Sequence, residues 1–331
     1  MKNKLRFAIY GCGVIAKIHA AAISELDGAD LYACADVVYD AAASFAEKHG
    51  IVALDNFDSV LESENVDVVC ICTPSGTHAK LAIKALEKNK HVVLEKPMAI
   101  SSEECNGIIS ALERSQAKIT VISQMRTSPD VLRAAELVNS GKLGKIILAE
   151  LNMRYYRGVE YYKGSWRGTK KMDGGGALMN QGIHGIDLIR YIMGPIKNVQ
   201  SIVRTLEHNI EVEDTAVAAL EYENGALGVI VASTATHPGF DREIKINGTR
   251  GAIELKEDRL VRMIIDGTEY PCEKFTSIGG AGNNTLLDHK AHARQIGDFI
   301  RAIRGENIRY VNESDGRCAV DIIEQIYKKS V

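Results

Sequence analysis

The sequence predicts an α/β chain in which a doubly wound parallel sheet comes first and an α+β domain with a large, mostly antiparallel sheet follows. Up to residue 123, short apolar runs alternate with helical runs, which is typical of a parallel sheet with helices on both faces. After residue 123, a few helices accompany strands of alternating polarity, which is typical of an antiparallel sheet. We therefore predict two domains, residues 1–123 and residues 124–331.

The hydrophobic periodicity places the individual elements. In the first domain it predicts strands at residues 7–10, 31–35, 66–73, 91–94 and 119–123, and helices at residues 14–26, 39–49, 77–89 and 101–115. In the second domain it predicts helices at residues 129–139, 174–193, 290–305 and 313–329, a strand at residues 145–154 and several strands between residues 199 and 265. No internal repeat or low-complexity tract interrupts this pattern.

Composition narrows the class of partner. The chain has 331 residues, of which 46% are hydrophobic, and a net charge of −3, so it carries no basic footprint for nucleic acid or an anionic membrane. We expect a small soluble ligand. The first residues lead directly into a strand without a long apolar segment, which favours a cytoplasmic protein. The seven cysteines lack CxxC spacing and are interpreted as buried thiols.

The first strand runs into Gly11-x-Gly13-x-x-Ala16 and then a helix. A tight turn at Gly11, close backbone approach at Gly13 and helix packing at Ala16 suit a pyrophosphate at a helix N-terminus. A glycine pair alone can serve packing, but Asp36 ends the second strand 20 residues after Ala16, where a carboxylate binds ribose hydroxyls. Two valines follow Asp36 instead of a cation for a ribose phosphate, so we predict NAD and consider NADP less favoured.

Two further segments follow parallel strands at the edge where ligands of such sheets bind. Thr73-Pro74 is predicted to lie under the ribose or nicotinamide. His78 lies just beyond, where it can equally be an ordinary residue of the helix's first turn. Glu95-Lys96-Pro97 puts a charged pair directly after a buried strand, and a proline fixes the chain there. This arrangement favours a functional Lys96 over a surface lysine.

In the second domain, three glycines at residues 174–176 lead into a helix that is apolar nearly all round. At 100° per residue, Asn180, His184 and Asp187 fall within a sector of about 60°. A polar stripe on such a helix either lines a cleft or is hydrogen-bonded internally. We predict function for Asn180 and His184 and an orienting role for Asp187. One imidazole and one carboxylate are too few for a metal site, so no metal is predicted.

These motifs together resemble the glucose-fructose oxidoreductase and inositol dehydrogenase (Gfo/Idh/MocA) family over essentially the whole chain. The resemblance is carried by Gly11-x-Gly13-x-x-Ala16-x-x-His19, Thr73-Pro74, Glu95-Lys96-Pro97, Trp166-Arg167, Gly174-Gly175-Gly176, Asn180-x-x-x-His184-x-x-Asp187 and Gln295-Ile296-x-Asp298-Phe299. It implies a Rossmann domain, an open-faced C-terminal sheet through which a homodimer or homotetramer forms, and hydride transfer between NAD(P) and a ring hydroxyl. It also implies that Lys96 and His184 are catalytic.

The motifs and the resemblance together predict the site residues. Contacts with the cofactor are expected from Gly11, Gly13, Val14, Ile15, Asp36, Thr73, Pro74, His78, Glu95, Lys96, Gln124, Trp166 and Arg167. Contacts with the substrate are expected from Lys96, Arg154, Asn180, His184 and His292. Gln124 and Arg126 follow the last strand of the first domain and are predicted at the hinge near the nicotinamide, while Arg167 is expected to reach the cofactor or a substrate anion.

The substrate is less defined than the reaction. Most polyol-oxidising members of the family have Asp where this chain has Asn180, and an amide cannot help as a base, which weakens an inositol assignment. The sequence around Trp166 and Asn180 is most similar to the UDP-N-acetylglucosaminuronate 3-dehydrogenase branch, as are residues 238–240 and the loop at residues 279–284. The alternatives are a polyol or inositol dehydrogenase, a glycosidase that uses NAD for transient oxidation, and a catalytically idle NAD or sugar sensor.

Overall fold

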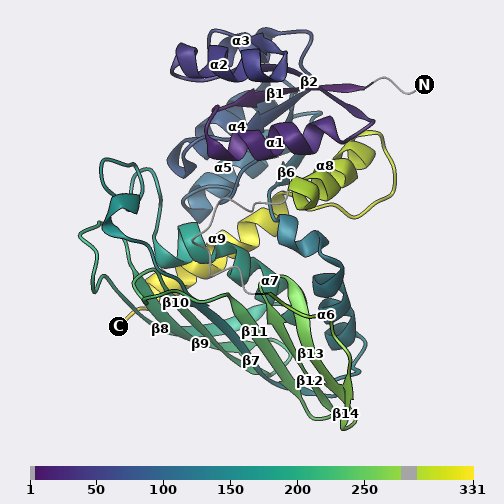
Figure 1. Cartoon of the computed structure of the whole chain (residues 1–331), viewed down its shortest axis with the longest axis vertical. Coiled ribbons are helices and arrows are strands. Elements are labelled where there is room, and N and C mark those ends of the chain that lie inside the picture. Colours follow the sequence, from purple (N-terminus) through teal and green to yellow (C-terminus); the bar gives the residue numbers. More distant parts are fainter. Residues whose placement is uncertain (1–3, 277–288) are drawn as a thin grey trace. The chain divides into compact units, whose positions relative to one another are not determined.

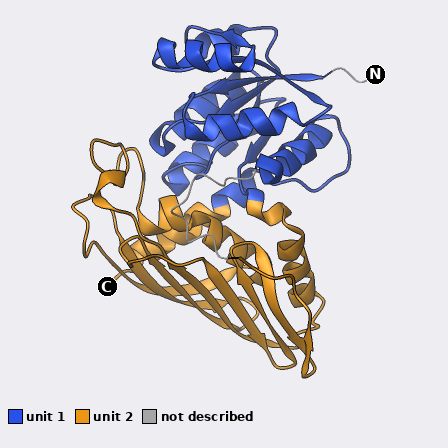
Figure 2. Cartoon of the chain, viewed as in Figure 1, with its two compact units in different colours: residues 1–124, 287–317 blue, residues 125–286, 318–331 orange. Residues whose placement is uncertain are grey.

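The computed structural model describes residues 4–276 and 289–331, and Figure 1 shows its elements. The chain divides into two compact units, drawn in Figure 2. Unit 1 comprises Met1–Gln124 and Leu287–Arg317, and unit 2 comprises Met125–Leu286 and Cys318–Val331. This division differs from the predicted single boundary after residue 123, because residues 287–317 return to the first unit.

The physical reason for this return is a shared apolar core. Helix α8 (His289–Ile303) contributes Ile296, Phe299 and Ile300, which pack in one buried cluster with Phe7 and Ile9 of the first strand. Helical periodicity predicted the helix itself, but no local pattern indicated the sheet on which it packs.

Unit 1 is the predicted doubly wound parallel sheet. Its strands β1 (Leu5–Tyr10), β2 (Ala29–Ala35), β3 (Val52–Ala53), β4 (Val68–Ile71), β5 (His91–Leu94) and β6 (Ile119–Val121) are ordered β3-β2-β1-β4-β5-β6 and pair in parallel. Its other helices are α1 (Val14–Ser24), α2 (Tyr39–His49), α3 (Phe57–Glu62), α4 (His78–Glu87) and α5 (Ser102–Glu113). The short β3 and α3 were not predicted, since each is too brief to show a hydrophobic period.

Unit 2 contains the predicted large sheet. Its strands are β7 (Ile146–Arg154), β8 (Ile196–Arg204), β9 (Thr215–Tyr222), β10 (Leu227–Ser233), β11 (Glu243–Gly248), β12 (Gly251–Lys256), β13 (Arg259–Ile265) and β14 (Thr268–Tyr270). Their order is β14-β13-β12-β11-β7-β10-β9-β8, and only β7 and β10 pair in parallel. The prediction of a mostly antiparallel sheet is confirmed.

One face of this sheet is covered by the helices α6 (Pro129–Asn139), α7 (Ile183–Met193) and α9 (Glu313–Lys328), as Figure 1 shows. Among the described residues no helix covers the other face. Burial alternates along β9, as expected for a sheet with one packed face. None of the described helices is long and apolar enough to cross a membrane.

The predicted helix at residues 174–193 has a different geometry in its first part. Ala177–Gly182 (η4) is a π-helix, and the α-helix α7 begins only at Ile183. The stripe was predicted with a rotation of 100° per residue throughout. Because Asn180 lies in the π-helix, its angular position relative to His184 and Asp187 differs from the predicted one. Single π turns occur often at functional sites.

Candidate active site

The glycine turn of unit 1 has the geometry of a pyrophosphate site. Gly11 has a φ of +94°, and a Cβ there would lie 2.6 Å from the carbonyl oxygen of Cys72, so only glycine fits. At Gly13, by contrast, a Cβ would meet nothing within 4 Å. Gly13 is also the N-cap of α1, so no side chain caps this helix. The helix N-terminus therefore opens to the outside, where an anion can accept from its N–H groups.

Asp36 connects this turn to the end of β2. Its Oδ2 accepts from the backbone N–H of Cys12 at 2.7 Å, and its Oδ1 accepts from that of Val38 at 2.9 Å. Each carboxylate oxygen has a second lone pair with which to accept from a ribose hydroxyl. The adjoining Val37 is 87% exposed and brings no charge to this position. The residues present therefore fit NAD.

His78 joins the two other predicted cofactor segments. Its ring is 1% exposed. Nδ1 lies 2.7 Å from the carbonyl oxygen of Pro97, and Nε2 lies 2.9 Å from that of Thr73. Burial lowers the pKa of this imidazole, although both carbonyls act in the opposite direction. His78 thus holds the loop after β4 against the loop after β5.

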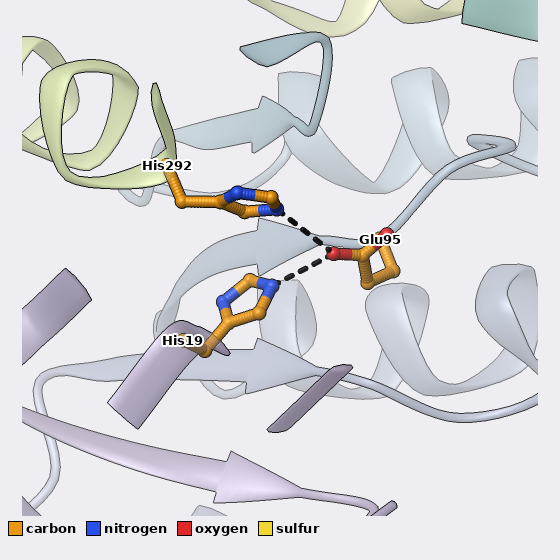
Figure 3. Close-up of side chains that lie close together, drawn as sticks. All are labelled: His19, Glu95 and His292. Atoms are coloured by element: carbon orange, nitrogen blue, oxygen red, sulfur yellow. Dashed lines mark hydrogen bonds and ion pairs between the residues drawn. The ribbon is translucent and has the colours of Figure 1, made fainter. Parts of the chain in front are cut away.

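The loop after β5 carries Lys96, whose backbone follows a strand that is buried along most of its length. Glu95, in contrast, is 6% exposed, and its carboxylate is turned toward His19 and His292 within unit 1 (Figure 3). Glu95 was predicted to contact the cofactor, and His292 was predicted to contact the substrate. In the structure these two side chains are buried and lie against each other inside unit 1.

In unit 2, the π-helix is held at its start by a buried acid. Glu213 accepts from the N–H groups of Gly176 at 3.0 Å and Leu178 at 2.8 Å, and from the Tyr327 hydroxyl at 2.9 Å. Burial raises the pKa of the Glu213 carboxyl despite these donors. A Cβ at Gly176 would lie 1.9 Å from the Glu213 carbonyl oxygen, so a glycine is needed there for packing.

Asn180 and His184 are both partly exposed, whereas the rest of this helical segment is largely buried. Asn180 donates from Nδ2 to Oδ1 of the buried Asp173 at 2.5 Å. Next to it, Gln181 accepts from Arg157 at 2.6 Å and donates to the Tyr161 hydroxyl at 2.7 Å. The start of the helix therefore presents a fixed polar array.

Arg126 and Asp187 form a buried ion pair within unit 2. The guanidinium donates to both carboxylate oxygens, at 2.8 Å and 2.5 Å, and the side chains are 6% and 5% exposed. The pair ties the turn at Gln124–Thr127 (η2) to α7, one helical turn beyond His184. Asp187 was predicted to have an orienting role, and in the structure it joins α7 to Arg126. Arg126 thereby supports α7.

The other predicted residues lie at the following positions. Arg167 lies over the rings of Tyr161 and Trp166, with its guanidinium carbon 4.7 Å and 5.2 Å from the ring centres. Arg154 lies over Phe240 and 3.7 Å from Glu243. Gln124 is the last residue of unit 1 before the chain enters unit 2. The loop at residues 279–284 lies outside the described residues.

Several polar residues of these sites were not predicted from the sequence: Asp173, Arg157, Gln181, Glu213 and Tyr327. Only the neighbouring pair of acids at residues 213–214, between two strands, gave a sign of unusual chemistry. Arg157 and Gln181 lie 24 residues apart, and Glu213 lies 35 residues from Leu178 and 114 from Tyr327, so spacing along the chain does not reveal these contacts.

The fold and the glycine turn define a dinucleotide-binding α/β protein, and comparison with known proteins identifies its family. Residues 5–123 match the model of the oxidoreductase family with an NAD-binding Rossmann fold, and residues 131–254 match the GFO/IDH/MocA C-terminal domain. The chain therefore belongs to the GFO/IDH/MocA family and is an NAD-binding oxidoreductase.

Relatives of known activity cover almost the whole chain. The WlbA dehydrogenase from Bordetella pertussis, solved in complex with NADH and UDP-GlcNAcA, is 28% identical, with a TM-score of 0.89 over 99% of this chain and 97% of that one. The myo-inositol 2-dehydrogenase of Thermotoga maritima is 26% identical over 99% of this chain and 96% of its own length. The glucose-6-phosphate 3-dehydrogenase of Bacillus subtilis is 28% identical over 98% and 96%.

Proposed function

We propose that the chain is an NAD-dependent dehydrogenase that oxidises a ring hydroxyl of a sugar or nucleotide sugar, with Lys96 and His184 as catalytic residues. The substrate we favour is a UDP-N-acetylglucosaminuronate, oxidised at C3. The observation that carries this choice is the similarity over nearly the full chain to WlbA, whose structure holds NADH and UDP-GlcNAcA.

The residues of unit 1 have defined parts in binding the cofactor. The N-terminus of α1 at Gly13 would hold the pyrophosphate, and Asp36 would accept from the adenosine ribose. When bound, NAD+ supplies a carbon that accepts a hydride with its electron pair. Because two valines and no cation follow Asp36 in the sequence, a 2′-phosphate would meet an uncompensated carboxylate, which favours NAD over NADP.

In the proposed reaction the substrate's C–H bond breaks toward the nicotinamide, and the proton of its hydroxyl goes to His184. An imidazole suits this because its reference pKa is about 6.5. General-base assistance is worth about 10²- to 10⁴-fold. Lys96 would stabilise the developing alkoxide by its positive charge. Asn180, held at its amide nitrogen by Asp173, would accept from a substrate hydroxyl with its amide oxygen.

A substrate panel tests the reaction. The purified protein is incubated with NAD+ and with sugars, inositols and UDP-sugars, while NADH absorbance is followed and products are identified by mass spectrometry. We expect NADH with the UDP-uronate and an oxidised sugar ring. A glycosidase would instead release a leaving group without net NADH, and a sensor would turn over none of the panel. Either result would refute the proposal.

Two substitutions test the residue roles. We expect Lys96→Ala to lower turnover by at least about 10²-fold, the scale of losing one stabiliser of an oxyanion, with NADH affinity nearly unchanged. We expect His184→Asn to lower it by about 10²- to 10⁴-fold. Lys84→Ala, at a surface pair with Asp58, and His49→Asn, at the end of α2, are the matched controls. Full activity in either test variant would remove that residue from the mechanism.

We further propose that the chain forms a homodimer or homotetramer through the sheet face without helices. This face has apolar side chains in adjacent strands: Ile202 and Val217 are paired across β8 and β9, and they are 53% and 45% exposed. Exposed apolar side chains that lie next to one another on a protein surface are typical of protein–protein interfaces. Light scattering of the purified chain gives its mass, and a monomer would refute the assembly.

A further inference from the structure

A buried cluster within unit 1 lies directly beside the proposed catalytic lysine. It consists of His19 from α1, Glu95 from the end of β5 and His292 from α8, which are 0%, 6% and 2% exposed (Figure 3). Nε2 of His19 lies 2.8 Å from Oε1 of Glu95, and Nε2 of His292 lies 3.7 Å from the same oxygen. Three segments far apart in the sequence thus converge on one carboxylate oxygen.

The second oxygen of Glu95 connects the cluster to the active site. Oε2 accepts from the backbone N–H of Lys96 at 3.1 Å. Burial raises the pKa of the Glu95 carboxyl, but the two imidazoles more than offset this effect and hold the pKa well below its ordinary value. Glu95 is therefore an ionised acceptor at neutral pH, held on one oxygen by the histidines and attached by the other to the backbone of Lys96.

The far side of Lys96 is held as well. The carbonyl oxygen of Pro97 lies 2.7 Å from Nδ1 of His78, whose other ring nitrogen lies near the carbonyl oxygen of Thr73. The backbone around Lys96 is thus held on one side by the buried Glu95 carboxylate and on the other by the buried His78 imidazole. A cluster that served only to fill the core would need no charged group, since burying a carboxylate is costly unless it is paired.

We propose that Glu95, held by His19 and His292, is a positioning residue that sets the place of the Lys96 ammonium. The inference rests on the proposed catalytic role of Lys96. In this role the Glu95 carboxylate acts on Lys96 through the Lys96 backbone N–H and does not itself contact the cofactor or the substrate. A misplacement of about 1 Å in a catalytic group can cost about 10²-fold in rate, so small movements of this carboxylate matter.

The test compares two replacements of His292. His292→Leu removes the ring nitrogen, whereas His292→Gln keeps an N–H donor of similar reach. We expect the Leu variant to lower kcat by about 10- to 100-fold, with KM for NAD+ within about twofold of wild type, and the Gln variant to recover most of that loss. His289→Leu is the matched control, because His289 lies one turn earlier on α8 and pairs with Glu25 at the surface.

A second arm shows whether the effect passes through Lys96. In the Lys96→Ala background, His292→Leu should cause no further loss of turnover, since residues that act through one group are not additive. If the Leu variant does not fold, Glu95→Asp, which keeps the charge but shortens the side chain by one methylene, replaces it with the same expected loss of kcat.

The outcomes separate this inference from the proposed function. An active Lys96→Ala enzyme refutes the role of the lysine itself. The positioning role alone is refuted if Lys96→Ala is inactive while His292→Leu and Glu95→Asp keep the wild-type kcat. It is also refuted if the double variant shows the full additive loss. Two imidazoles and a carboxylate are also a ligand set for a transition metal. A stoichiometric metal in the purified protein that His292→Leu abolishes would therefore overturn the inference.

Discussion

Replacing Asp187 with Asn tests how the helix that carries His184 is held. The Arg126–Asp187 pair is bidentate and nearly completely buried, with side chains 6% and 5% exposed. The Asn variant removes the negative charge of Asp187 from the buried Arg126 guanidinium. Breaking a buried pair in this way costs about 3–5 kcal/mol. A domain of this size loses about 2–4 °C per kcal/mol, so we expect the melting temperature of unit 2 to fall by about 6–20 °C.

The chain contains a matched control for this change. Arg250 and Asp266 form the same bidentate contact, at 2.9 Å and 2.7 Å, but the side chains are 59% and 54% exposed. Exposed pairs are worth about 0–1 kcal/mol, so Asp266→Asn should change the melting temperature little. Differential scanning calorimetry of both variants measures the contrast. The reasoning is refuted if Asp187→Asn is no more destabilising than Asp266→Asn.

The remaining predictions concern the cofactor site and one further acid. Gly13→Ala should fold normally but bind NADH at least about tenfold more weakly, because the added Cβ enters the space of the phosphates. Gly11→Ala should instead lower the melting temperature, because its Cβ meets the backbone of Cys72. Equal losses of stability in the two variants would contradict this contrast. The wild-type enzyme should prefer NAD+ over NADP+ by about tenfold or more in kcat/KM, and Asp36→Ser should reduce that preference. Asp214 accepts from three backbone N–H groups, which offset the effect of burial and lower the pKa of its carboxyl. Its stabilising effect is therefore present above the unfolded pKa of about 3.9 and is lost as the pH falls through the folded value, so the gap in urea midpoint between wild type and Asp214→Asn should narrow only below about pH 4.

Much of unit 1 could be predicted from sequence because its signals are local. The turn at Gly11 and Gly13 directly follows a strand, and Asp36 ends the next strand at the spacing that a βαβ unit imposes. Lys96 was singled out by its place after a buried strand. Each of these positions is fixed by a few neighbouring residues, so the order of amino acids carries the information.

The sequence did not reveal what depends on contacts between distant segments. The π-helix at Ala177–Gly182 begins on N–H groups held by Glu213, 35 residues away from Leu178, and its altered turn is invisible to a period of 3.6. The sequence predicted α8 but not its return to the first unit, and that return is what brings His292 to Glu95. Burial, pairing and charge state at these sites are properties of the packed chain, since they arise only when side chains far apart in the sequence exclude water together.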